Sequence, residues 1–204
     1  MANALFKVAE WISRIAYLNL LWVLFSFLGL VIFGFFPATV TMFVISRRWF
    51  RGETDLPVFK TFAKTFKQEF IKANSYGVMI VLIGLVGYAQ LLFIDVNPDA
   101  QTLVFQISFY LFVLFTSLTL IYLFPVYVHY DLSFFNVFKQ AFLIMLIHPL
   151  TTIGILISIG LTFWVMYYLP GLLFFFGGSF TVLLIMGMTY STFLTIDEKA
   201  REQS

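Results

Sequence analysis

The sequence contains no cysteine and few charged residues. The absence of cysteine excludes disulfide bonds, cysteine-ligated zinc and thiol catalysis. Asp, Glu, Lys and Arg make up 11% of the 204 residues, whereas hydrophobic residues make up 61%. Soluble domains carry about 25% charged residues, so this chain cannot cover itself with a water-compatible surface. It is expected to be an integral membrane protein. The net charge of +2 is too small and too localised to indicate a nucleic-acid partner.

The chain also lacks the residue groupings that enzymes use. It has no glycine-rich phosphate loop, so it is not expected to hydrolyse ATP by itself. His129 and His148 are far apart in sequence and have no metal-ligand spacing to a carboxylate. Every acidic residue is expected in a loop or a terminus rather than in a cleft. We therefore predict a protein that is not an enzyme and that uses no cofactor and no metal.

Long uncharged runs predict the membrane spans. No charged residue occurs from Ile15 to Ser46, or from Gln140 to Ile196. One helix over the first run would be about 48 Å long, against about 30 Å of bilayer hydrocarbon. Gly34 and Pro37 are the expected break, with 38–50 continuing at an angle. The prediction is a single all-α polytopic membrane domain over 1–204, with five spans at about 15–36, 78–94, 102–124, 149–168 and 172–194.

A basic segment at 47–72 predicts the orientation of the chain. It holds seven of the twelve Lys and Arg residues: Arg47, Arg48, Arg51, Lys60, Lys64, Lys67 and Lys72. Because basic short loops stay on the cytoplasmic side, this segment and the C-terminus are predicted inside, and the acidic connection 95–101 outside. Five spans then place the N-terminus outside, despite Lys7 and Arg14. The alternative is a re-entrant pair that includes 38–50, with the N-terminus inside.

Within the basic segment, 56–72 is predicted to form an amphipathic helix. Phe59, Phe62, Phe66 and Phe70 recur every three or four residues, and Lys60, Lys64, Lys67 and Gln68 fall mostly elsewhere. Such a helix fits the lipid headgroup boundary. It fits equally well as a cover over the cytoplasmic end of the bundle. Asn74, Ser75 and Gly77 are expected to interrupt it before the next span.

Few polar residues interrupt the predicted spans or border them. Most are expected to form hydrogen bonds between helices; a path for a neutral solute is the minor alternative. The candidates for intramembrane polar contacts are Asn19, Trp22, Asn74, Gln90, Gln106 and His148. A short internal similarity, 66–70 with 138–142, suggests a unit of span, surface helix and span used twice. Chance in a phenylalanine-rich chain explains it equally well.

Several of these motifs resemble the YesL family of small bacterial membrane proteins. The residues that carry the resemblance are Asn19-Leu-Leu-Trp22, Gly34-Phe-Phe-Pro37-Ala38-Thr39, the run from Arg47 to Glu53, Phe62, Phe66-Lys67, Phe70, Asn74, Tyr127, Tyr130 and His148-Pro149. The likeness covers essentially the whole chain and is strongest over 15–77. It implies a protein of the cytoplasmic membrane of Gram-positive bacteria with an accessory role in oligosaccharide import, beside sugar ABC importers. It implies no catalytic residues.

The leading expectation is a non-enzymatic accessory or assembly subunit of a carbohydrate ABC importer. The expected partners are membrane lipid, the permease subunits and, as a further candidate, the ATPase; a homo-oligomer is left open. The residues expected at the partner or membrane surface are Arg47, Arg48, Trp49, Arg51, Phe59, Phe62, Lys64, Phe66, Lys67 and Phe70. The alternative, from a different class, is an autonomous facilitator or channel for a small neutral solute.

Overall fold

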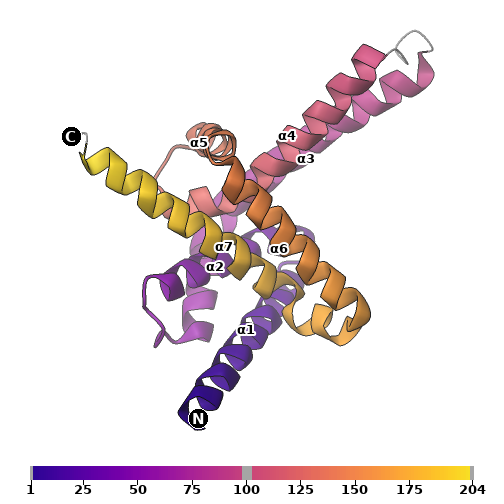
Figure 1. Ribbon diagram of the computed structural model, residues 1–204. Helices are drawn as coiled ribbons and strands as arrows, with labels where there is room; N and C mark the ends of the chain where they lie inside the picture. Colours follow the sequence, from indigo (N-terminus) through magenta and orange to yellow (C-terminus); the bar gives the residue numbers. More distant parts are fainter. Residues whose placement is uncertain (1, 98–102, 203–204) are drawn as a thin grey trace.

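Every regular element in the described part of the chain is an α-helix (Figure 1). The computed structural model describes residues 2–97 and 103–202. The helices are α1 (Ala2–Leu28), α2 (Ile32–Phe50), α3 (Val58–Val96), α4 (Leu103–His129), α5 (Phe134–Ile147), α6 (Pro149–Tyr168) and α7 (Pro170–Glu202). Five of them, α1, α3, α4, α6 and α7, are long and apolar enough to cross a membrane. The predicted all-helical polytopic fold with about five spans is confirmed. The expected outside connection 95–101 lies largely beyond the described residues.

The break after the first span lies earlier than predicted. The chain reverses between Leu28 and Ile32, where Leu30 and Val31 have φ values of 58° and 62°. A side chain on Gly29 would collide with the backbone of Gly34, so the two glycines let α1 and α2 approach closely. The expected break at Gly34 and Pro37 is therefore wrong.

Pro37 instead lies inside α2. A proline has no N–H, so it leaves the carbonyl four residues earlier, that of Phe33, without its helical donor. The side-chain amide of Asn74 on α3 donates to this carbonyl at 3.0 Å. In a membrane a freed backbone group must be satisfied from a neighbouring element, and α3 does so here.

The reversal places the middle of α1 next to the basic segment. The Arg14 guanidinium donates to the Thr54 carbonyl at 2.6 Å, and the Trp11 and Trp49 rings meet edge to face at 5.5 Å. This part of α1 and the loop after α2 therefore lie side by side. This contact is the pairing that the re-entrant alternative expects. Which side of the membrane each chain end faces stays a prediction.

The predicted surface helix 56–72 and the predicted span 78–94 form one uninterrupted helix, α3, of 39 residues. The expected break near Gly77 is wrong for two reasons. Asn74 and Ser75 turn their side chains onto the carbonyls of Phe70 and Ile71, within an intact helix. Gly77 makes room for the ring of Phe36 instead of ending the helix. At about 58 Å, α3 is longer than the bilayer core, so its charged first half extends beyond it.

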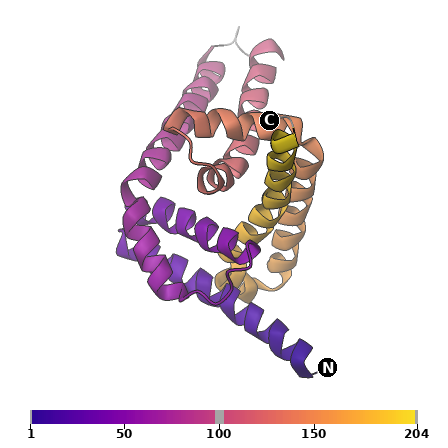
Figure 2. The ribbon, with the colours of Figure 1, turned by 90° about the vertical axis from the view of Figure 1, so that its left-hand side faces the viewer.

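Helix α2 lies at the centre of the molecule and packs against α1, α3, α4 and α7 (Figure 2). The second half of α3 and the first part of α4 form a hairpin that extends away from this core (Figure 1). The short α5 includes 138–142, the second copy of the internal similarity. It ends at Ile147, and His148 separates it from α6, whereas α3 continues without a break. Helix α7 continues through the polar tail to Glu202.

Candidate functional site: a basic face and a tyrosine-lined pocket

The first half of α3 presents lysines on one side and buries phenylalanines on the other. Phe62 is fully buried and Phe66 nearly so, and their rings lie 4.9 Å and 5.1 Å from that of Phe25 on α1. Lys60, Lys64, Lys67 and Lys72 are exposed. The aromatic stripe therefore packs mainly against the protein, which favours the covering helix over the lipid-facing one. Phe59 remains half exposed, and Phe70 packs on Phe66.

The arginine-rich end of α2 divides into buried and exposed residues. Arg47 is partly buried and donates to the carbonyl of His129 at 3.3 Å. Trp49 is buried against Trp11. Arg48 and Arg51 are exposed, and both lie within 4 Å of the Glu53 carboxylate. Arg47 and Trp49 thus hold helices together, whereas Arg48 and Arg51 belong to the surface. We use "basic face" for Arg48, Arg51, Lys60, Lys64, Lys67 and Lys72.

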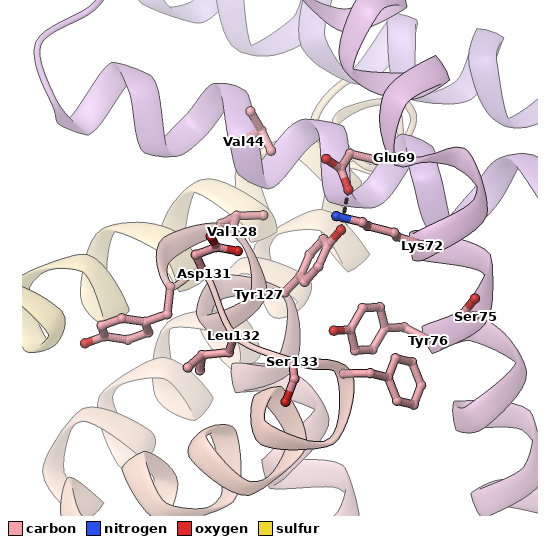
Figure 3. Close-up of a pocket in the computed structure, with 12 residues that line it drawn as sticks. Val44, Glu69, Lys72, Ser75, Tyr76, Tyr127, Val128, Asp131, Leu132 and Ser133 are labelled. Atoms are coloured by element: carbon pink, nitrogen blue, oxygen red, sulfur yellow. Dashed lines mark hydrogen bonds between the residues drawn. The ribbon is translucent and has the colours of Figure 1, made fainter.

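A pocket of about 440 Å³ lies beside the basic face, where α3, α4 and the start of α5 meet (Figure 3). This volume is within the range of small-molecule sites. It is lined by Val44, Glu69, Lys72, Ser75, Tyr76, Tyr127, Val128, Tyr130, Asp131, Leu132, Ser133 and Phe134. We call it the tyrosine pocket.

Hydrogen bonding leaves some polar groups of the tyrosine pocket occupied and others available. The Tyr127 hydroxyl donates to the Glu69 carboxylate and joins α4 to α3. Lys72 follows Glu69 by three residues, so the two are neighbours on one helix face. The side chain of Tyr76 is 97% buried and its ring stacks on Phe134 at 4.6 Å. Its hydroxyl points into the pocket (Figure 3) and forms no hydrogen bond within the described chain.

A polar cluster next to the tyrosine pocket connects the end of α7 to α4. Asp197 accepts a hydrogen bond from the Tyr130 hydroxyl at 3.3 Å, and its other oxygen lies 3.3 Å from His129 Nε2. Burial, and then the negative charge of Asp197, raise the pKa of Tyr130. Tyr130 therefore stays protonated and keeps donating at physiological pH. This cluster, like Arg47, stabilises the junction of α2, α4 and α7.

Of the predicted intramembrane polar residues, Asn19 and Trp22 both lie against Gly178, and the others lie elsewhere. Asn19 is buried between α1 and α7, where it donates to Phe174 O and accepts from the N–H groups of Gly178 and Ser179. Trp22 donates to Thr39 on α2. Gln90 and Gln106 lie on the α3–α4 hairpin, and Asn74 bonds at the α1–α2 turn. His148 joins α5 to α6, and its backbone carbonyl accepts from Thr152. The structure does not bring these residues to one site.

The sequence reasoning did not select Glu69, Tyr76 or Asp197 as site residues. Asp197 has one detectable signal, since it is the first charged residue after the uncharged run 140–196. Glu69 lies between Lys67 and Lys72, and neither it nor Tyr76 has such a signal. Which tyrosine they meet depends on contacts between distant helices. Within residues 2–97 and 103–202, no three His, Asp or Glu side chains gather closely enough to hold a metal ion.

Comparison with known proteins places the chain among bacterial sequences without an assigned role. Residues 15–91 match the family described as "Protein of unknown function, DUF624". Three Bacillus subtilis proteins described as uncharacterized are similar over most of their length. YesL is 34% identical over 204 residues, all of this chain and 96% of YesL. YesV and YteU are each 35% identical, over 91% and 96% of this chain and 89% and 88% of their own. No solved structure matches the chain significantly.

Proposed function

Because the chain belongs to the YesL family and is a multi-pass membrane protein, we propose that it is a non-enzymatic accessory or assembly subunit of a carbohydrate ABC importer in the bacterial cytoplasmic membrane. The resemblance to YesL-type proteins suggests the importer. The main observation in favour of a subunit role is the exposure of the basic face. Its lysines stay exposed while Phe62 and Phe66 of the same helix segment are buried.

The charges of the basic face are available to a partner. Arg48 and Arg51 share the single Glu53 carboxylate, at 3.7 Å and 3.8 Å. Lys60, Lys64 and Lys67 form no ion pair within 4 Å in the described chain. Such a cluster steers and orients an acidic surface on a partner protein. Anionic lipid headgroups would meet the same charges at the membrane surface.

The orientation we propose places both chain ends and the basic face in the cytoplasm. The α1–α2 reversal puts Arg14 next to Thr54, so Lys7 and Arg14 share the side of the basic face. All the basic clusters then obey the positive-inside rule. The conflict that five crossings create at the N-terminus disappears.

The alternative, a facilitator for a neutral solute, requires a continuous polar path. Gln90 and Gln106 would have to line it together with the serines and threonines of the spans, and both glutamines lie on the α3–α4 hairpin that extends away from the core (Figure 1). The arrangement of the polar residues therefore supports the accessory role better.

The test is affinity purification of the tagged protein from its native membrane in mild detergent, followed by mass spectrometry. The proposal predicts stoichiometric recovery of two permease subunits, with or without an ATPase. Recovery of the protein alone, or only with copies of itself, contradicts it and redirects attention to solute flux in liposomes.

A further inference from the structure

The tyrosine pocket lies where two long helices change from charged to uncharged sequence. Lys72 is the last charged residue of α3 before Asp95, and Asp131 is the first charged residue after α4. Because charge is expensive inside hydrocarbon, such residues mark the level of the lipid headgroups. The tyrosine pocket therefore opens at the border of the membrane.

Charges of both signs line this pocket (Figure 3): the carboxylates of Glu69 and Asp131 and the ammonium group of Lys72. Lys72 and Asp131 are exposed, and neither forms an ion pair within 4 Å in the described chain. Glu69 is partly buried and accepts from Tyr127, which leaves other lone pairs of its carboxylate free. Two carboxylates against one ammonium group give the lining a net charge of −1, so it attracts a positively charged group.

A ligand with an ammonium group beside a phosphate complements both kinds of charge. A primary ammonium has three N–H donors and no acceptor, so it can bond the carboxylates of Glu69 and Asp131. The phosphate can pair with Lys72, since lysine binds phosphate as a point charge. A ligand with only the ammonium would leave Lys72 unpaired, and one with only the phosphate would meet two carboxylates.

Apolar cavities follow the tyrosine pocket along α3 toward the α3–α4 hairpin. The ring of Phe138 on α5 lies 5.7 Å from that of Tyr76, and Phe138 also lines a cavity of about 140 Å³ with Ile83 and Leu120. A second cavity, of about 360 Å³, shares Ile83 and Leu120 and extends to Leu91. From Tyr76 to Leu91 the helix rises about 22 Å, which exceeds the roughly 15 Å of hydrocarbon in one leaflet. These cavities are long enough for an acyl chain.

We propose that this region binds one phospholipid whose headgroup carries an ammonium and a phosphate, the chemistry of phosphatidylethanolamine. The ammonium binds to Glu69 and Asp131, the phosphate binds to Lys72, and an acyl chain lies in the apolar cavities between α3 and α4. A soluble zwitterion would occupy the tyrosine pocket and leave the apolar cavities empty. This inference goes beyond docking to an importer and does not depend on it.

The test is lipid binding to the purified, delipidated full-length protein in detergent, measured by native mass spectrometry. The probes are phosphatidylethanolamine, phosphatidylglycerol and phosphatidylcholine with identical acyl chains, and soluble phosphoethanolamine. Phosphatidylethanolamine is expected to bind saturably, one molecule per chain, and at least about threefold more tightly than each other probe.

Each other outcome overturns part or all of the proposal. No saturable binding of phosphatidylethanolamine overturns it entirely. Phosphatidylglycerol has no ammonium group, and phosphatidylcholine has one without N–H donors, so equal or tighter binding of either contradicts the ammonium site. Equal binding of soluble phosphoethanolamine contradicts the role of the apolar cavities and makes the ligand a soluble molecule.

Two variants connect the binding to the tyrosine pocket. Asp131→Asn and Lys72→Gln each remove one exposed charge, and each should weaken phosphatidylethanolamine binding roughly two- to fivefold. Asp95→Asn and Lys199→Gln, at exposed positions outside the pocket, are the matched controls and should bind as the wild type does. Unchanged affinity in both pocket variants, or an equal loss in the controls, overturns the assignment. Because this binding is measured on the isolated protein, its failure leaves the purification test of the importer role intact.

Discussion

At the scale of single residues, two asparagines complete helical backbones that are interrupted. Asn74 donates to the Phe33 carbonyl that Pro37 leaves free. Asn19 donates to the carbonyl of Phe174 and accepts from the N–H of Gly178. In a regular helix these two backbone groups would bond to each other. Gly178 has no side chain, and a Cβ there would lie 3.1 Å from the Asn19 oxygen. An inserted side chain of this kind is a recognised cause of helix bending.

Replacing Asn19 should therefore destabilise the contact between α1 and α7. In Asn19→Leu the Phe174 carbonyl and the Ser179 N–H lose their side-chain partner within a buried contact. The expected loss is about 1–3 kcal/mol of unfolding free energy, measured as a lower thermal unfolding midpoint in detergent. Asn136→Leu, at an exposed position on α5, is the matched control. Equal midpoints for the two variants would show that Asn19 does not carry this contact.

Some residue roles can be predicted from the sequence, and others cannot. A single amide in a long uncharged run is costly in a membrane, so the sequence predicts that Asn19 forms an interhelical hydrogen bond. The sequence predicts a polar contact for Asn74 too, but its acceptor depends on Pro37 lying next to α3, which only the fold reveals. Tyr76 could not be singled out among ten tyrosines, because nothing in its neighbourhood in sequence distinguishes it.

At the scale of elements, the helical segments could be predicted and the joints between them could not. Uncharged runs predict where helices cross, because charge inside hydrocarbon is expensive. Where one helix ends and the next begins depends on contacts between helices that are distant in sequence. Glycine and proline predict helix breaks, yet Gly77 accommodates the ring of Phe36, and Pro37 is tolerated because Asn74 bonds the carbonyl that it leaves free. The real reversal uses two residues with positive φ, Leu30 and Val31, whose side chains give no such signal.

The α1–α2 reversal makes a prediction about topology. Because the chain has no cysteine, single cysteines can be introduced and labelled with a membrane-impermeant maleimide. Ala9→Cys and Glu53→Cys should react only after the cells are permeabilised, because both sites lie on the side of Arg14 and Thr54. Asn97→Cys, after the end of α3, should react on intact cells. Labelling of Ala9→Cys on intact cells would place the N-terminus outside and reject the proposed orientation.

At the scale of the whole molecule, the buried core and the exposed face have different roles. Arg47 and Trp49 stabilise the junction of helices, so their substitution would perturb the fold as well as any docking. The exposed lysines of α3 can be changed with little effect on buried contacts. They are therefore the positions at which recognition can be separated from stability. The sequence could not make this division, since all seven basic residues of 47–72 carry the same charge.

The measurement that tests the central claim most directly is co-purification of the permease with a charge-reversed basic face. The variant carries Lys60→Glu, Lys64→Glu and Lys67→Glu together. The control, Lys7→Glu, Lys139→Glu and Lys199→Glu, makes the same change in net charge at exposed positions elsewhere. Reversal turns attraction into repulsion, so recovery of the permease should fall at least about tenfold with the first variant and little with the second. Equal recovery of the permease with both variants would contradict docking through the basic face.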